Sequence, residues 1–259
     1  MLSALHIWPQ RHVIWHKAWA DFRAESQRTY LGYLWWIIDP VLNTILYFLV
    51  FGYFLSRGDA DFIPFLVIGI VGWFWFSQSV DAAGRSIWHN ANLLRQVAIN
   101  KLVFPCSQIL NGLLKFGFSM IVVVGALLLY RFFPGVWWLL LPIPIIVELL
   151  FICGIAFLLA AIIPFVPDIA SFVPYVLRFA FFMSGIMYKL EELPELGQTF
   201  LYYNPMVHIL EAYRAVLMYE TAPDWGPLGV IAALSIVAIL IGATLVHRFD
   251  GLYAKRIVS

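Results

Sequence analysis

Six long apolar runs constrain the fold of this chain more than any other feature of its sequence. They lie near residues 35–56, 62–82, 108–131, 137–163, 169–187 and 227–246. A bilayer core about 30 Å thick is crossed by a helix of roughly 20 mostly apolar residues. Because backbone groups in lipid must be hydrogen-bonded internally, we expect helices here. The sequence therefore predicts an all-α integral membrane protein with six transmembrane helices.

The composition excludes several classes of protein. Hydrophobic residues make up 63% of the 259 residues and charged residues only 12%, whereas soluble domains have roughly 45–50% and about 25%. A soluble fold of this size could not bury so much apolar surface, so a soluble enzyme is excluded. The 16 Lys and Arg against 15 Asp and Glu leave no basic surface for nucleic acid.

The basic residues predict the orientation in the membrane. Loops rich in Lys and Arg stay in the cytoplasm, and one side of a six-span chain holds most of them: Arg11, Lys17, Arg23, Arg28, Arg85, Arg95, Lys101, Arg248, Lys255 and Arg256. Both termini are therefore predicted to be cytoplasmic. We expect one domain over 1–259, with an interfacial segment at 1–34, a bundle at 35–246 and a tail at 247–259.

The N-terminal segment 5–28 has an aromatic helical pattern. Alternating spacings of four and three place one set on a single face: Trp8, His12, Trp15, Trp19 and Phe22. This pattern predicts an interfacial helix on the cytoplasmic leaflet. The alternative is an amphipathic helix packed on its own bundle.

The segment 83–105, between the second and third spans, is polar, basic and longer than an ordinary connection. We expect a cytoplasmic helix there. Its candidate contacts to a cytoplasmic partner are Arg85, Trp88, Asn92 and Arg95. A solvated loop helix without a partner is the alternative.

A pair of helices is expected on the outer side before the last span, within 188–226. Asn204 and Pro205 have the residue types of a helix N-cap and first turn. The apolar stripe that follows leaves Glu211 and Arg214 on another face, which is typical of a helix lying in or near the outer leaflet.

Sequence motifs of covalent chemistry are missing. There is no phosphate-binding G-x-x-x-x-G-K-[ST] loop, no H-E-x-x-H and no G-x-S-x-G. His12 and His16 are four residues apart, but no further ligand is placed beside them. We therefore expect no catalysis, no metal and no cofactor bound by this chain itself.

Two aromatic stripes are candidates for a substrate path. One stripe lies on the fifth predicted span, where Arg178 is a further candidate, and the stripe on the first span includes a polar amide. The candidates are Trp36, Asn43, Tyr47, Phe51, Phe172, Tyr175, Arg178, Phe179 and Phe182. Aromatic faces offer sugar rings a flat apolar surface along which a polymer can slide. Helix packing or lipid contact is the alternative interpretation.

Ionisable residues within spans are costly and point to function. Glu148 and Arg178 fall at similar depth in the fourth and fifth spans, so a structural ion pair is one expectation. The other is that Arg178 faces a pore and attracts a lipid phosphate or an acidic polymer.

Two motifs carry a resemblance to a known family. The run Leu31–Pro40, LGYLWWIIDP, resembles the start of the first span in membrane subunits of capsular polysaccharide ABC exporters. The run Asn204–Glu211, NPMVHILE, with Arg214 after it, resembles the segment before their last span. Length and span count agree over essentially the whole chain. The sequence thus resembles type-2 ABC exporter permeases, in the capsule and O-antigen branch.

The resemblance implies a mechanism and a set of partners. Two copies of the permease would form a pore in the bacterial inner membrane, among membrane lipids. Two separate cytoplasmic ABC ATPases would bind ATP and Mg²⁺ and drive export of a lipid-linked polysaccharide. A periplasmic co-polymerase-type protein and an outer-membrane channel would complete the route.

Several other functions stay open on the sequence alone. Type-2 permeases for O-antigen, a teichoic-acid-like polymer, a small lipid or a drug share this topology, although the two motifs favour capsule. An integral-membrane lipid-linked sugar transferase would need a catalytic cluster on one leaflet. A structural scaffold would not explain ionisable residues at mid-depth.

Overall fold

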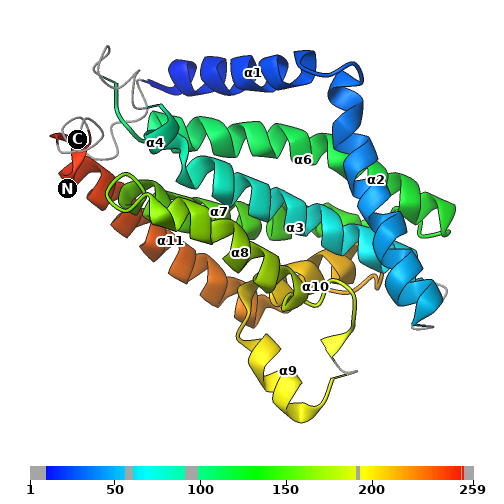
Figure 1. Ribbon diagram of the computed structural model, residues 1–259. Coiled ribbons are helices and arrows are strands. Elements are labelled where there is room, and N and C mark those ends of the chain that lie inside the picture. Colours follow the sequence, from blue (N-terminus) through cyan, green and yellow to red (C-terminus); the bar gives the residue numbers. More distant parts are fainter. Residues whose placement is uncertain (1–9, 56–60, 91–98, 191–192, 252, 254–259) are drawn as a thin grey trace.

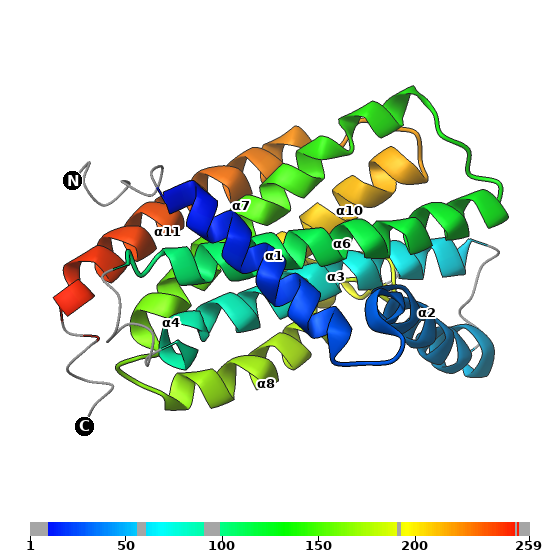
Figure 2. The same cartoon turned by 90° about the horizontal axis from the view of Figure 1, so that it is seen from above.

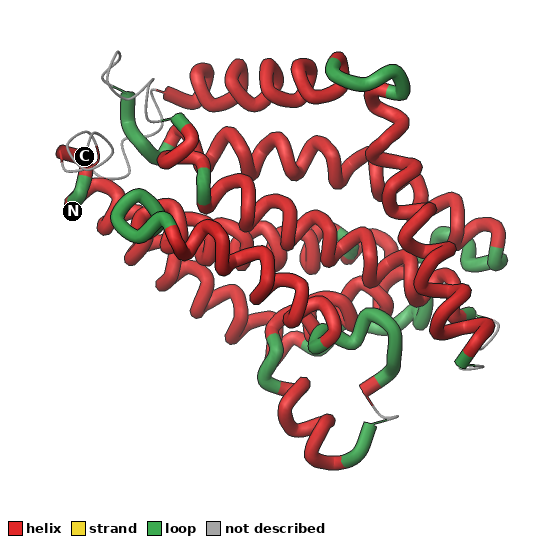
Figure 3. Tube along the Cα trace, viewed as in Figure 1, coloured by secondary structure: helices red, strands yellow, loops and turns green. Residues whose placement is uncertain are grey.

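The computed structural model describes residues 10–55, 61–90, 99–190, 193–251 and 253. Every regular element in these ranges is helical (Figures 1 and 3). The elements are α1 (Arg11–Gln27), η3 (Gly32–Leu34), α2 (Trp35–Tyr47), η4 (Phe48–Phe54), α3 (Phe62–Gly84), α4 (Ser86–His89), α6 (Val103–Leu129), η5 (Val136–Leu140), α7 (Pro142–Ile162), α8 (Asp168–Phe182), α9 (Glu195–Tyr202), α10 (Pro205–Leu217) and α11 (Trp225–Arg248). The prediction of an all-α fold is confirmed.

Five helical stretches are long and apolar enough to cross a membrane. They are Gly32–Phe54, Phe62–Gly84, Val103–Leu129, Val136–Ile162 and Trp225–Arg248. Each coincides with one of the predicted spans, namely the first four and the last. Long apolar runs thus produced the expected helices with boundaries shifted by a few residues.

The predicted fifth span at 169–187 corresponds to α8, which has 15 residues. At 1.5 Å per residue this helix is about 22 Å long, which is less than the thickness of the hydrocarbon core. The six-span count therefore stays a prediction.

Helix α3 forms the centre of the bundle. In its most apolar window 78% of residues are buried, against 11% in the first span. It contacts α2, α6, α7, α8 and α10, and the view from above places it between α6 and α8 (Figure 2). Helices α7 and α11 also pack closely. A Cβ added to Gly242 of α11 would lie only 2.7 Å from the Cβ of Phe157 of α7, which is too short for a normal contact.

Helix α1 packs against the first half of α6 and crosses it at an angle (Figure 2). Its buried residues are Ala18, Phe22 and Ser26. The helix itself is confirmed, and its aromatic residues share one face, since Trp15 stacks on Trp19 and Trp19 on Phe22. Trp15 and Trp19 are 49% and 46% exposed, and Trp8 lies outside the described residues. The interfacial location stays a prediction. The small Ala18 allows close approach to α6, which leaves the large indoles outside the contact.

The segment 83–105 contains the short helix α4, four residues long. Arg85 and Trp88 belong to this part, while Asn92 and Arg95 lie outside the described residues. The following span begins at Val103, earlier than predicted, because Pro105 sits in the first helical turn, where no backbone N–H is needed. Helices α9 and α10 form at the positions expected for the pair before the last span.

Candidate functional site: a groove between α2, α3 and α8

Helix α8 carries a row of exposed aromatic side chains. Phe172, Tyr175 and Phe179 are 65%, 67% and 68% exposed, and Phe182 is 47% exposed. The opposite face is buried through Ala170, Val173 and Phe181. The sequence periodicity predicted this row correctly as a single helical face. Its exposure leaves the ring faces free to contact a ligand, lipid or another chain.

A groove with a volume of about 410 Å³ lies beside this row, between α2, α3 and α8. In Figure 1, α8 runs below α3 and α2 crosses the right-hand part of α3. Its lining combines aromatic and polar side chains: Tyr47, Trp73, Phe74, Ser77, Gln78, Asp81, Arg178, Phe181 and Phe182, with Pro174 and Leu177. Such a lining can offer both flat apolar surfaces and hydrogen bonds.

The structure brings together only part of the predicted path. Tyr47, Arg178 and Phe182 line the groove. The other candidates on the first span lie elsewhere. Asn43 donates to the Asp39 backbone oxygen at 2.9 Å and to Asp39 Oδ1 at 3.1 Å, and Phe51 packs against the core.

Trp36 belongs to an aromatic cluster that joins α1, the start of α2 and α6. Its ring centroid is 4.3 Å from that of Phe22, 5.3 Å from Tyr33 and 5.5 Å from Phe118. This cluster fixes the turn between α1 and α2. The Leu31–Pro40 motif thus has a packing role at this corner.

The groove residues on α3 were missed by the sequence analysis. Ser77, Gln78 and Asp81 lie near the end of an otherwise apolar helix. Polar side chains in a span are expensive unless they face a partner or a cavity, and that signal could have found them. Asp81 is also paired with Arg85, at 2.7 Å between Oδ1 and Nη2.

The second motif fixes α10 to its neighbours. The Asn204 side chain caps the helix by accepting from the Met206 backbone N–H at 3.0 Å, and it donates to the Met183 carbonyl oxygen at 2.6 Å. Pro205 occupies the first turn. Asn204 therefore joins the start of α10 to the end of α8.

Arg214 is almost completely buried, at 1% exposure. Its Nη1 donates to Glu211 Oε1 at 2.6 Å, and its Nη2 donates to the carbonyl oxygens of Phe65 and Ile186, each at 3.4 Å. The guanidinium also lies 3.4 Å from the Phe65 ring centroid. Burial lowers the pKa of Arg214, and Glu211 acts in the opposite direction. The motif therefore stabilises the contact of α10 with α3.

The sequence matches the ABC-2 type transporter family over residues 12–218, which include both motifs and every helix of the groove. The chain belongs to the ABC-2 type transporter family.

Relatives of this ABC-2 chain cover most of its length. It is 28% identical to the O-antigen export system permease protein RfbA of Myxococcus xanthus, over 85% of each chain. It is 24% identical to the polysialic acid transport protein KpsM of Escherichia coli, over 87% of this chain and 88% of the relative. It is 24% identical to the capsule polysaccharide export inner-membrane protein CtrC of Neisseria meningitidis serogroup A, over 93% and 92%.

The expected ion pair between Glu148 and Arg178 is wrong for this ABC-2 chain. Glu148 is fully buried, and its Oε2 accepts from the Tyr213 hydroxyl at 2.8 Å while Oε1 has no partner. Arg178 is exposed on α8 and lines the groove. The two side chains do not meet because Glu148 is buried beside Tyr213, whereas Arg178 is exposed at the groove.

The candidate docking region of the ABC-2 fold is only partly described. Arg85 is engaged with Asp81, and the Trp88 ring stacks on His89 with centroids 5.4 Å apart. Lys101, just before α6, pairs with Asp250 after α11, at 2.7 Å. Within the described ranges no three His, Cys, Asp or Glu side chains are grouped as metal ligands.

Proposed function

We propose that this chain is the membrane subunit of an ATP-driven exporter that moves a lipid-linked surface polysaccharide across the bacterial inner membrane. The observation that carries the proposal is the aromatic and polar groove between α2, α3 and α8, together with the exposed aromatic row of α8. Relatives whose names refer to O-antigen, polysialic acid and capsule polysaccharide support this choice of substrate.

The groove fits a polymer that must slide. Aromatic rings contact sugar rings through their flat apolar faces without strong bonds, so a chain can advance from ring to ring. Ser77 and Gln78 can exchange hydrogen bonds with passing hydroxyl groups, and Arg178 can attract acidic or phosphate groups. Since the groove is open on one side, a second copy of the chain would close it into a pore.

ATP hydrolysis is assigned to two separate cytoplasmic ATPase subunits, which hold ATP and Mg²⁺. Their docking surface would comprise α1 and the segment after α3, including Arg85, Trp88, Asn92 and Arg95. Helix α1 is suited to pass on a movement because Asp21 and Glu25 bond to Gln108 and Lys115 of α6.

The proposed topology places both termini in the cytoplasm, with α8 and the residues after it as the sixth crossing. Helices α9 and α10, with Asn204, Pro205, Glu211 and Arg214, would then border the outer end of the pore. A co-polymerase-type protein in the periplasm and an outer-membrane channel would receive the polymer. Capsule is the proposed cargo, with O-antigen as the other member of the same class.

The decisive experiment deletes the gene and measures polysaccharide on intact cells. We expect the surface polymer to disappear and lipid-linked polymer to accumulate inside, with both effects reversed by the gene on a plasmid. The tagged protein should also co-purify with an ABC ATPase and hydrolyse ATP only in that complex. A deletion strain with an unchanged surface coat would refute the proposal.

A further inference from the structure

A second groove lies against another face of α2, between α2, the start of α3 and the second half of α6. Its volume is about 380 Å³. Helix α2 therefore borders two spaces, because Tyr47 lines the groove described above and a row of residues one helical turn apart lines this one. We call the second space the apolar groove. Its walls on α2 and α6 include Val41, Ile45, Phe48, Ile121, Gly125 and Leu129.

The lining of the apolar groove suits a hydrocarbon chain. Among its residues the polar one is Thr44, whose hydroxyl already donates to the Pro40 carbonyl oxygen at 2.7 Å. All three walls belong to helices long and apolar enough to cross a membrane. Apolar cavities do not hold water, and an empty space forfeits dispersion contacts. In a membrane the available occupant is therefore an acyl chain.

A glycine opens one wall of the apolar groove. A Cβ added to Gly125 of α6 would meet no atom within 4 Å. The residues one turn before and after it, Ile121 and Leu129, are 57% and 83% exposed. The free space therefore reaches the α6 backbone, and a flexible chain can lie against it.

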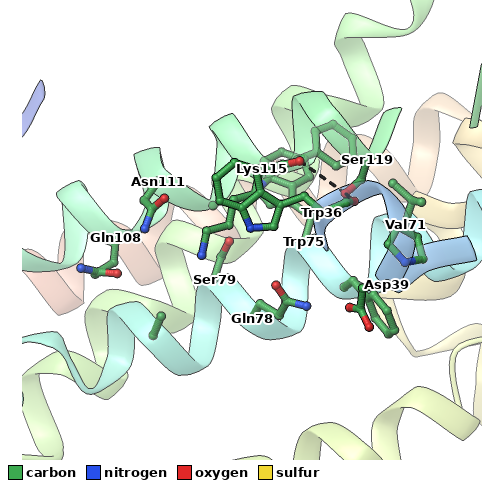
Figure 4. Close-up of a pocket in the computed structure, with 15 residues that line it drawn as sticks. Trp36, Asp39, Val71, Trp75, Gln78, Ser79, Gln108, Asn111, Lys115 and Ser119 are labelled. Atoms are coloured by element: carbon green, nitrogen blue, oxygen red, sulfur yellow. Dashed lines mark hydrogen bonds between the residues drawn. The ribbon is translucent and has the colours of Figure 1, made fainter. Parts of the chain in front are cut away.

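Contacts between α2 and α6 close one end of the apolar groove. The Ser119 hydroxyl donates to the Trp36 carbonyl oxygen at 3.0 Å, next to Ile37 in the groove wall. Lys115, one turn earlier on α6, has its Nζ 5.9 Å from the centroid of the Trp36 ring. Figure 4 shows Trp36, Lys115 and Ser119 together at this point. A chain must therefore enter from the other end, where α3 begins and α6 ends, which is the outer end in the proposed topology.

The open end carries an arginine in an unusual backbone conformation. Arg131 lies two residues beyond Leu129, is exposed and has a φ of 66°. The backbone N–H of Arg131 donates to the Leu128 oxygen at 3.2 Å, and that of Phe132 donates to the Leu127 oxygen at 2.9 Å. This is the helix end at which glycine is usual, because other side chains are strained there. Strained residues cluster at binding sites, so a use of the Arg131 side chain is indicated.

The charges at the open end match a phospholipid headgroup. A guanidinium binds phosphate through parallel hydrogen bonds, which Arg131 can supply. Asp61 is also exposed and precedes Ile63 of the groove wall by two residues, so its carboxylate can accept from an ammonium group. A zwitterionic headgroup carries both partners, a phosphate and an ammonium group.

We propose that the apolar groove binds one acyl chain of a membrane phospholipid from the outer leaflet, with the phosphate of its headgroup at Arg131. The inference uses the proposed topology and goes beyond the proposed function. Since α2 borders both grooves, the bound chain would also hold this wall of the polymer path in place.

The test compares matched variants of the purified full-length protein. Gly125→Leu places a side chain in the apolar groove. Gly117→Leu is the control, because Gly117 is also exposed on α6, an added Cβ there also meets no atom within 4 Å, and it lies outside the groove lining. Arg131→Gly removes the guanidinium and should keep the helix end intact, since glycine adopts a positive φ without strain.

The probes are phosphatidylethanolamine and a diacylglycerol with the same acyl chains, which lacks the phosphate. The Kd of the first bound lipid is measured by native mass spectrometry in detergent. We expect Gly125→Leu to lose this binding for both lipids, because the leucine occupies the space of the chain, and Gly117→Leu to retain it. Arg131→Gly should weaken phosphatidylethanolamine binding about tenfold, the effect of a lost charge-assisted hydrogen bond, and leave the Kd of diacylglycerol unchanged.

Four results would overturn the inference. The first is lipid binding by Gly125→Leu equal to that of Gly117→Leu, and the second is wild-type affinity of Arg131→Gly for phosphatidylethanolamine. The third is a lipid-linked polymer, in place of phospholipid, that co-purifies with the wild type and is lost in Gly125→Leu, which would assign the groove to the cargo. The fourth is conversion of a dimer to a monomer by Gly125→Leu, which would assign the groove to a second copy of the chain.

The lipid measurements and the export measurement can fail separately. If lipid binding fails and the deletion strain has lost its surface polymer, the lipid site is refuted and the proposed function stands. An intact surface coat together with the expected Kd values would refute the proposed function and leave the lipid site in place.

Discussion

Single side chains in this protein join helices that are far apart in the sequence. Arg214 is the clearest case, because its guanidinium contacts Glu211, two backbone carbonyl oxygens and the Phe65 ring. A planar group with five donors can satisfy such a set, and an ammonium group cannot. The Glu148–Tyr213 hydrogen bond is a second link, between α7 and α10.

The first prediction concerns Arg214→Lys. We expect the variant to lose about 1–3 kcal/mol of stability, because at least one buried acceptor is left without its donor. The measurement is the midpoint of thermal unfolding in detergent. Arg178→Lys is the matched control and should unfold as wild type, since Arg178 is exposed. Equal midpoints for Arg214→Lys and wild type would contradict the role given to the guanidinium.

The second prediction concerns Tyr213→Phe, which removes the hydrogen bond that the Tyr213 hydroxyl donates to the buried Glu148. Both carboxylate oxygens would then be unpaired, and we expect a loss of about 1–3 kcal/mol. Thermal unfolding measures the effect. Tyr203→Phe serves as the control because Tyr203 is 79% exposed. Similar unfolding of both variants would argue against this link.

At the scale of elements, α8 and α1 have separate tasks. Helix α8 presents aromatic side chains outward, and α1 is bonded to α6 through Asp21 and Glu25. The first arrangement suits contact with a polymer, and the second suits transmission of force. Each can be altered without disturbing the core, because the changed side chains are partly or largely exposed.

The third prediction is a loss of export on replacing the aromatic row. Tyr175→Ala combined with Phe179→Ala should lower surface polysaccharide by about tenfold or more, because stacking on each ring contributes about 1 kcal/mol. The amount of protein in the membrane should not change, since both side chains are exposed. Leu234→Ala on α11, 65% exposed, is the control. Normal export by the double variant would remove α8 from the path.

The fourth prediction uses the pair of Glu25 and Lys115, whose side chains are 49% and 20% exposed. Glu25→Lys should slow export by placing like charges together, while stability falls by no more than about 1 kcal/mol, as for partly exposed pairs. The double variant Glu25→Lys with Lys115→Glu restores opposite charges and should recover export. Failure of the exchange to restore export would mean that the pair does not couple α1 to α6.

On the scale of the molecule, the helices were predictable from the sequence because a long apolar run in lipid has few alternatives to a helix. Helix α8 differed from the predicted fifth span, because it has only 15 residues and carries an exposed aromatic face. Hydropathy alone does not distinguish such a helix from one that crosses the whole membrane. The direction in which a helix faces was harder to predict. That is why Glu148 was paired wrongly and why Ser77, Gln78 and Asp81 were missed.

The fifth prediction addresses assembly. If two copies close the groove, Phe179→Cys in a background with Cys106→Ala and Cys153→Ala should give a covalent dimer with a short bifunctional thiol reagent. The reason is that a two-fold axis brings the same surface of both copies together. Leu234→Cys should stay monomeric under the same treatment. The reverse pattern would place the dimer contact on α11.

The uneven burial of the bundle has a mechanical consequence. Helices α2 and α8, which border the groove beside α3, lie at the edge of the bundle. The first span, which contains α2, is the least buried of the five: 11% of the residues in its most apolar stretch are buried, against 78% for α3. Moving α2 or α8 away from α3 would separate little tightly packed surface, so widening the groove would need little free energy. A tightly packed central helix α3 with weakly packed helices beside it would allow the groove to admit polymers of different width, whether branched or linear.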